Sequence, residues 1–177
     1  MQIDPADRRK EQALVFAAGS ARYALRLAQI EQVLGVRPMR ALAHAPLGIL
    51  GLLTWREQLL PLVDLSLLST RIPCVHRVGT RILIVRAPWG AHQAQREAAS
   101  PHFALLAERV FDVIALSFRV PAFDVAAERY LGGFVDAEGQ PQLLIPDALR
   151  DLCLSNGASM AHDAANDASD VAIGVGR

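Results

Sequence analysis

The sequence lacks an excess of either charge, because its 177 residues carry 18 basic and 18 acidic side chains. Proteins that bind nucleic acid or an anionic membrane electrostatically usually show a basic excess, and this chain does not. Long apolar runs are also missing, since the longest, Leu47–Trp55, is much shorter than the roughly 20 residues that cross a bilayer. Arg8, Arg9 and Lys10 precede an apolar stretch that is too short for a signal peptide. We therefore expect a cytoplasmic protein without nucleic-acid partners or direct membrane insertion.

Cysteine is scarce, and recognised catalytic motifs are missing. Cys74 and Cys153 form no CxxC motif, so the sequence predicts two free, buried thiols in a reducing compartment. There is no P-loop, dinucleotide-binding glycine motif, HExxH or GxSxG. The five histidines show no metal-ligand spacing and lie at His44, His76, His92, His102 and His162. The sequence thus predicts no enzyme activity, no metal site and no cofactor.

What the sequence does contain is a series of short apolar runs separated by turn residues. Eight or more such runs with little helix favour an all-β barrel or sandwich. A Pro-Asp start followed by an amphipathic pattern predicts a short C-terminal helix over residues 146–154. Residues 90–102 are polar and are typical of a long hairpin loop. The runs with strand character are 13–18, 21–27, 48–55, 58–65, 80–87, 102–110 and two within 130–145.

The segment 27–35 has a different spacing. Leu27, Ile30, Val33 and Leu34 recur at intervals of three to four, which predicts one or two helical turns that Gly35 ends. Ile30, Val33 and Leu34 have two interpretations: they pack in the core, or one edge of the segment lines a groove between the barrels that accepts a partner helix. At least one of them is expected in the core.

The composition predicts three regions. Residues 1–12 are polar and expected to be flexible, and residues 155–177 are rich in small and polar residues and are expected to form a disordered tail. Residues 13–154 form the folded part.

The stretch "GILGLLTWREQLLPLVDL" (48–65) raises the main question about function. Arg56 and Glu57 interrupt an apolar run, and unpaired charges are costly to bury. They either form the polar turn of a hairpin or are presented to a partner. Asp64 closes the run and either caps a short helix that follows or contacts a partner.

The order of these motifs resembles that of the CheW-like chemotaxis coupling domain over residues 13–154, with softer similarity to the Wsp-type surface-sensing subgroup. The resemblance implies two five-stranded SH3-like β-barrels packed side by side. It also implies scaffolding between the cytoplasmic tip of a methyl-accepting chemoreceptor and the regulatory domain of a CheA-type histidine kinase, without a cofactor or catalytic residue. The positions that match the family motif are Gly51, Leu52, Leu53, Trp55, Arg56, Pro61, Leu62, Val63, Asp64 and Leu65.

Two positions depart from the family pattern. Glu57 replaces a glycine that would permit a positive φ, so we expect a turn of another type. Gln32 replaces a glutamate, so we expect it to hydrogen-bond to Arg56 without an ion pair.

The predicted partner-binding residues combine the motif with these neighbours. Glu108 is included, although it is also compatible with a solvated strand edge beside Asp112. Two alternatives to the coupling adaptor stay open: a diverged module that competes for the kinase or receptor, and a small enzyme or ligand-binding barrel. The predicted partner-binding set is Ile30, Gln32, Val33, Arg56, Glu57, Asp64 and Glu108.

Overall fold

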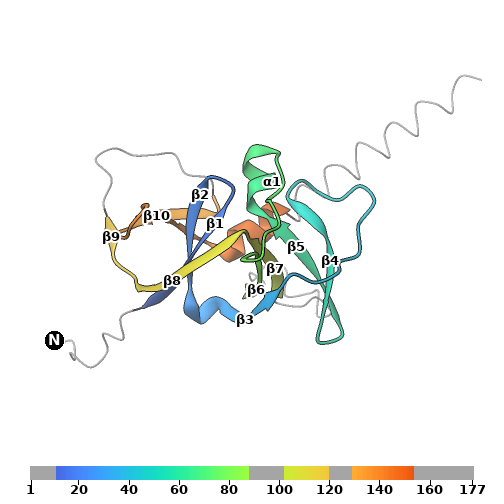
Figure 1. Ribbon diagram of the computed structural model, residues 1–177, viewed down its shortest axis with the longest axis horizontal. Coiled ribbons are helices and arrows are strands. Elements are labelled where there is room, and N and C mark those ends of the chain that lie inside the picture. The colour runs from blue at the N-terminus through green and yellow to red at the C-terminus, as the bar shows by residue number, and fades with distance from the viewer. Residues whose placement is uncertain (1–10, 88–101, 120–128, 154–177) are drawn as a thin grey trace, which may run out of the picture.

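The computed structural model describes residues 11–87, 102–119 and 129–153. The predicted flexible tail, most of the N-terminal segment and most of the polar loop 90–102 lie outside these residues. Within them the chain forms two β-sheets that lie next to each other (Figure 1).

The first sheet has the strand order β8-β1-β2-β11-β10-β9. Its two edge strands, β8 and β9, are consecutive in the chain and only two residues apart, so the chain itself connects the edges and the sheet curves into a barrel. The strands are β1 (Gln12–Ala18), β2 (Ala21–Arg26), β8 (Arg109–Ala115), β9 (Phe118–Arg119), β10 (Leu131–Val135) and β11 (Gln142–Leu144).

The second sheet has the order β3-β6-β7-β5-β4. Its edge strands are joined by a side-chain hydrogen bond in which Trp55 Nε1 of β4 donates to Gln32 Oε1 of β3 at 2.9 Å. The all-β prediction with two barrels is confirmed, and the first sheet has a sixth strand because the two-residue β9 pairs with β10. The strands are β3 (Ile30–Gly35), β4 (Ile49–Trp55), β5 (Gln58–Asp64), β6 (Arg81–Arg86) and β7 (His102–Ala107).

The helix predicted over 27–35 is wrong beyond its first turn. A single 3-10 turn, η2 (Leu27–Gln29), connects the barrels, and β3 then pairs with β6 in antiparallel register. β-branched side chains favour strands, and the ladder with β6 overrides the helical spacing. Leu34 is buried, which confirms that one member of the apolar set lies in the core, whereas Val33 is 47% exposed.

Gly51 of β4 makes room for the chain segment that connects β3 to β4. A Cβ on Gly51 would lie 2.5 Å from the Arg40 carbonyl oxygen, so only glycine lets the β3–β4 connection cross β4 this closely. There the Arg40 N–H donates to the Leu52 carbonyl, and the Leu52 N–H donates to the Arg40 carbonyl, both at 2.8 Å.

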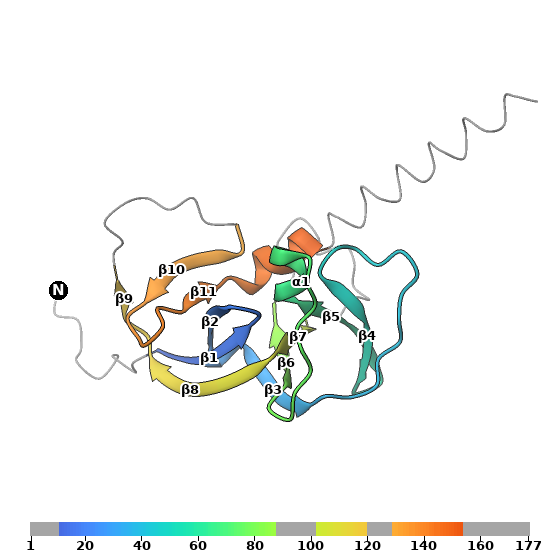
Figure 2. The same cartoon turned by 45° about the horizontal axis from the view of Figure 1, so that its top comes forward.

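One hydrophobic core extends through both sheets and includes Phe16 and Leu25 of the first barrel and Ile84 and Leu105 of the second. Residues 146–153 form the predicted C-terminal helix, which lies at the junction of the barrels beside α1 (Leu65–Thr70) (Figure 2). Its Leu149 belongs to the same core. The chain therefore folds around a core that neither barrel completes alone.

The two cysteines are free and buried, as predicted. Burial raises the pKa of Cys74 to about 12, with a further contribution from Asp64, and burial also raises the pKa of Cys153 to about 11. Because the thiolate is the reactive form, both are inert core side chains at neutral pH.

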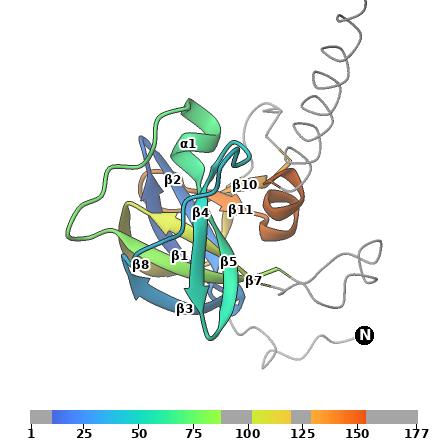
Figure 3. The same cartoon turned by 90° about the vertical axis from the view of Figure 1, so that its right-hand side faces the viewer.

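Asp64 is the N-cap of α1, which stands above the junction (Figures 1 and 3). Its Oδ1 accepts hydrogen bonds from the N–H groups of Ser66 at 2.9 Å and Leu67 at 3.2 Å, and Oδ2 accepts one from the Cys74 N–H at 2.8 Å. The predicted capping role is confirmed. Because its side chain is 0% exposed, Asp64 has no surface for a direct partner contact.

We predict that Asp64→Ala lowers the free energy of unfolding by about 2 to 3 kcal/mol, because it removes the cap of α1 and leaves the buried Cys74 N–H without an acceptor. Urea unfolding followed by circular dichroism measures the change. Asp64→Asn should lose less, since its side-chain oxygen can still cap the helix, and the exposed Asp112→Ala serves as control. Equal losses in Asp64→Ala and Asp112→Ala would contradict this interpretation.

Candidate partner-binding surface

The tip of the β4–β5 hairpin is a two-residue loop made of Arg56 and Glu57. Trp55 pairs with Gln58, and the φ angles of the loop residues are 44° and 65°. Two consecutive left-handed residues are typical of the hairpin turn whose twist matches that of the strands. The expectation of another turn type is therefore wrong: the register leaves room for only two residues, so Glu57 adopts the conformation that glycine would adopt without strain.

Arg56 is held on two sides although its side chain is 65% exposed. Its guanidinium carbon lies 4.5 Å from the centroid of the Trp55 ring, and Nη1 lies 3.6 Å from Oε1 of Glu31. The expected hydrogen bond from Arg56 to Gln32 is not observed, because Gln32 accepts from Trp55 instead. Arg56 nevertheless has an ion pair, because Glu31, the residue before Gln32, provides the carboxylate.

A β-bulge explains why Glu31 takes this role. Ile30 pairs with Val85 and Gln32 pairs with Ile84, so Glu31 is an extra residue in β3. A bulge redirects the side chain at that position, here toward the hairpin tip. The bulge therefore explains how Glu31, and not only its neighbour Gln32, contacts the hairpin.

Three residues outside the predicted partner-binding set complete the cluster: Glu31, Arg86 and His102. Arg86 Nη2 lies 2.5 Å from Glu31 Oε2, and this hydrogen bond is the main cause that holds the pKa of Glu31 below its ordinary value. The His102 ring lies 5.1 Å from the Trp55 ring, and burial lowers the pKa of His102. Only the pairing of β3, β6 and β7 brings these residues together, so sequence spacing carries no signal for them.

Contacts of Gln32 with Trp55 and of Glu31 with Arg56 bring β3 beside the β4–β5 hairpin, and we call β3 together with Arg56 and Glu57 the hairpin-tip surface. Ile30 is half-buried against the core, and Val33 and Gln32 are exposed on β3. Arg56 and Glu57 lie on the adjacent hairpin tip. Asp64 is buried elsewhere, as described above.

Glu108 lies away from this surface. In the β6–β7 ladder, Arg86 pairs with His102 at one end and Arg81 pairs with Ala107 at the other, so Glu108 lies about 20 Å from His102 by the rise of a strand. The chain passes from the second sheet to the first at this residue, which is why the predicted strand 102–110 is divided.

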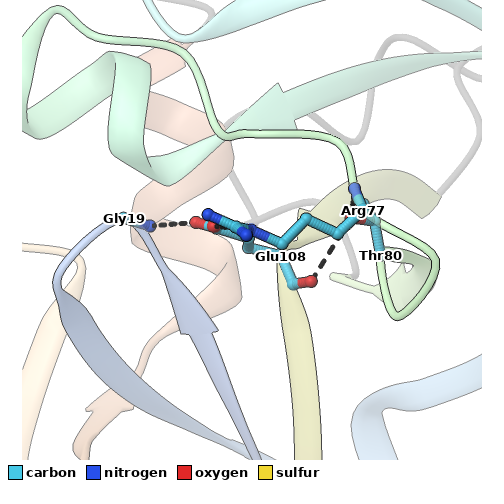
Figure 4. Close-up of polar contacts among 4 residues, drawn as sticks. All are labelled: Gly19, Arg77, Thr80 and Glu108. Carbon is cyan, nitrogen blue, oxygen red and sulfur yellow. Dashed lines mark hydrogen bonds and ion pairs between the residues drawn. The ribbon is translucent and has the colours of Figure 1, made fainter.

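Glu108 joins the two barrels. It is only 15% exposed, and its carboxylate accepts hydrogen bonds from the Gly19 N–H at 3.2 Å and from Arg77 Nε at 3.3 Å (Figure 4). Its carbonyl accepts one from the Thr80 hydroxyl at 3.3 Å. The interpretation of Glu108 as a solvated strand edge is therefore wrong, because the crossing places its side chain at the junction.

Neither a metal site nor a membrane span is evident in the part of the chain that the structure describes. Residues 11–87, 102–119 and 129–153 contain no group of three or more His, Cys, Asp and Glu side chains that could hold a metal ion. No helix in these residues is long and apolar enough to cross a membrane.

Comparisons with known proteins agree with this architecture. The model of the CheW-like domain family matches residues 12–150. A solved structure of the scaffolding protein CheW from Thermoanaerobacter tengcongensis is similar in fold, with a TM-score of 0.61 and 16% sequence identity over 76% of this chain and 88% of that chain. No curated protein matches at a significant level. The Wsp-type subgroup is not tested by these matches and stays a prediction.

We predict that Glu57→Gly raises the free energy of unfolding by about 0.5 to 1 kcal/mol, because glycine occupies the left-handed region without the steric cost of a Cβ. Urea unfolding monitored by Trp fluorescence measures the gain. Glu57→Ala removes the same charge but keeps the Cβ, so it should give no such gain. If both variants were equally stabilised, the charge and not the backbone would be the cause.

Proposed function

The chain belongs to the CheW-like domain family, and from that membership we propose that it couples a methyl-accepting chemoreceptor to a CheA-type histidine kinase. The family consists of scaffold proteins of chemotaxis signalling. We further propose that the protein works in the cytoplasm, possesses no enzymatic activity or cofactor, and reaches receptor clusters by protein contacts alone.

The observation that carries the proposal is the way Arg56 is presented. An exposed arginine normally loses side-chain entropy when a partner binds it. Here Trp55 and Glu31 already hold the guanidinium at the hairpin tip. Arginine can pair in a planar, bidentate manner with a partner carboxylate. Such an arrangement is typical of an arginine that recognises a partner. A residue that only has to be polar to form the turn would not need these contacts.

Exposed apolar side chains lie on or beside the strands that carry Arg56 and its partner Glu31. Val33 on β3 and Leu59, which pairs with Thr54 next to the hairpin tip, are both exposed, and Leu27 is partly exposed before β3. An amphipathic helix binds by placing apolar side chains on such positions while its polar residues meet charges at the rim. This supports a helix at the tip of a receptor as the partner at Val33.

The second candidate function is a module that competes for the kinase or receptor outside a standard array. Two observations favour it: Gln32 is engaged by Trp55, and Glu57 adds a negative charge beside Arg56. The same reconstitution separates the two functions. An adaptor increases kinase activity in the presence of receptor, whereas a competitor binds one partner and decreases that activity.

We predict that Arg56→Ala weakens binding to the partner at the hairpin tip about tenfold, equivalent to about 1.4 kcal/mol, because it removes a preorganised charged contact. The assay mixes the protein with a receptor cytoplasmic fragment and a CheA-type kinase and measures co-sedimentation and kinase autophosphorylation. Arg37→Ala removes an exposed arginine from the β3–β4 connection and is the matched control. Normal co-sedimentation and kinase autophosphorylation with Arg56→Ala would show that Arg56 has only a structural role at the hairpin tip.

We predict that Val33→Asp keeps the fold and abolishes binding of the receptor fragment, because the side chain is exposed and its apolar contact is lost. Leu34→Asp, one residue further, should instead unfold the protein, since Leu34 is in the core. Val78→Asp changes a fully exposed valine far from the hairpin tip and should bind normally. Circular dichroism and co-sedimentation distinguish these outcomes, and normal receptor binding by Val33→Asp would exclude β3 from the interface.

A further inference from the structure

A second surface lies on the outer face of the first barrel, next to the junction. Ala17 of β1 pairs with Arg22 of β2 on one side and with Arg109 of β8 on the other. The small Ala17 side chain leaves room between the two arginines, and the ring of Phe111 lies close to both. The guanidinium carbons of Arg22 and Arg109 are 4.6 Å and 5.8 Å from its centroid. We call this the Arg22–Phe111–Arg109 surface.

The two guanidinium groups have no counter-ion among the residues that the structure describes. Arg22 donates a hydrogen bond to the carbonyl of Glu138 at 3.1 Å, and neither arginine forms an ion pair there. The carboxylate of Glu108 is already engaged by Gly19 and Arg77. Phe111 is also 39% exposed, so the surface offers an apolar ring between two uncompensated positive charges.

A recess of about 320 Å³ adjoins these side chains. It is large enough for one or two side chains of an incoming segment, and both charged and aromatic side chains line it. Its lining residues are Ala17, Gly19, Arg77, Glu108, Arg109 and Phe111. An occupant should therefore carry carboxylates for the arginines and small or apolar side chains for Phe111.

The chain itself contains a segment of this chemistry. Residues 154–177 carry Asp163, Asp167 and Asp170 against the single cation Arg177, and Val171 and Ile173 follow the aspartates. The described residues, in contrast, contain thirteen arginines against ten carboxylates. The C-terminal segment thus carries the negative charge that could pair with Arg22 and Arg109.

The chain length permits this contact. A stretch of about 17 residues, as between Cys153 and Asp170, spans up to roughly 55 Å when extended. A domain of this size has a radius of gyration of only about 14 Å. Residues 120–128 also carry two carboxylates, but they follow β9, which comes after the last residue of β8, whereas Arg109 is the first residue of β8.

We propose that the acidic segment 163–170 of this chain docks on the Arg22–Phe111–Arg109 surface. The aspartates pair with Arg22 and Arg109, and the contact is intramolecular. The segment then covers the face of the first barrel and leaves the hairpin-tip surface free, because that surface lies at the opposite end of the β6–β7 ladder. This inference does not depend on the proposed coupling function.

The test uses the full chain with a nitroxide spin label on Ser169→Cys. Cys74 and Cys153 are buried, so the label attaches selectively to the new thiol. Amide NMR signals of Gly19 and Phe111 should lose intensity at least about threefold at roughly 0.02 M salt and recover at roughly 0.5 M salt, because screening weakens the contact. No loss at low salt would overturn the proposal.

Variants connect the effect to the named charges. Arg22→Gln with Arg109→Gln should restore the signals, and Arg109→Gln alone provides the same test if the packing of Arg22 beside Gly139 is disturbed. Arg37→Gln with Arg40→Gln removes two arginines from the β3–β4 connection and should leave the broadening unchanged. Replacing Asp163, Asp167 and Asp170 by asparagine should abolish it. Broadening that survives both the arginine and the aspartate variants would refute the docking.

A mixed sample identifies the occupant. Isotope-labelled protein without a nitroxide is combined with spin-labelled protein that is not isotope-labelled. The intramolecular proposal predicts no broadening in this mixture. Broadening there of the same size as within one chain would show that the segment binds a second copy, and the proposal would be wrong.

Discussion

The larger of two hydrophobic core clusters extends through both barrels and is the constraint on which the rest of the structure depends. Because the barrels share this core, a polar group that is buried at their junction is costly unless it finds a partner inside the protein. Asp64 satisfies three backbone N–H groups, and Glu108 accepts from Gly19 and Arg77. Two acidic residues that could have served a partner are therefore used to hold the fold together.

The surfaces that remain available lie at opposite ends of β6 and β7. At one end, Glu31 and Trp55 fix Arg56 at the hairpin tip. At the other, Arg22 and Arg109 flank Phe111 on the first barrel. The two surfaces are separated by the length of the β6–β7 ladder, because one lies near its Arg86–His102 end and the other near its Arg81–Ala107 end. A scaffold protein benefits from such an arrangement because occupation of one surface leaves the other accessible.

The hairpin tip combines backbone strain with a preorganised side chain. Glu57 occupies the left-handed region without the freedom of glycine, which costs stability. Local strain of this kind persists only where the surrounding structure compensates for it. Here the β4–β5 ladder and the contacts of Arg56 provide that compensation, so the position of the arginine is determined by the strands and not by the loop sequence.

The sequence by itself determined the strand runs, the hairpin at residues 56–57, the cap at Asp64 and the buried thiols, because these depend on local spacing and composition. The order of its motifs indicated the CheW-like family by resemblance, and the family model matches the chain. Only the tertiary structure decided that residues 30–35 form a strand, since the ladder with β6 outweighs helical spacing. It also decided that Glu31, and not Gln32, pairs with Arg56, because a one-residue bulge changes which side chain faces the hairpin. The role of Glu108 depends on where the chain crosses between sheets, and such long-range pairing leaves no periodic trace in the sequence.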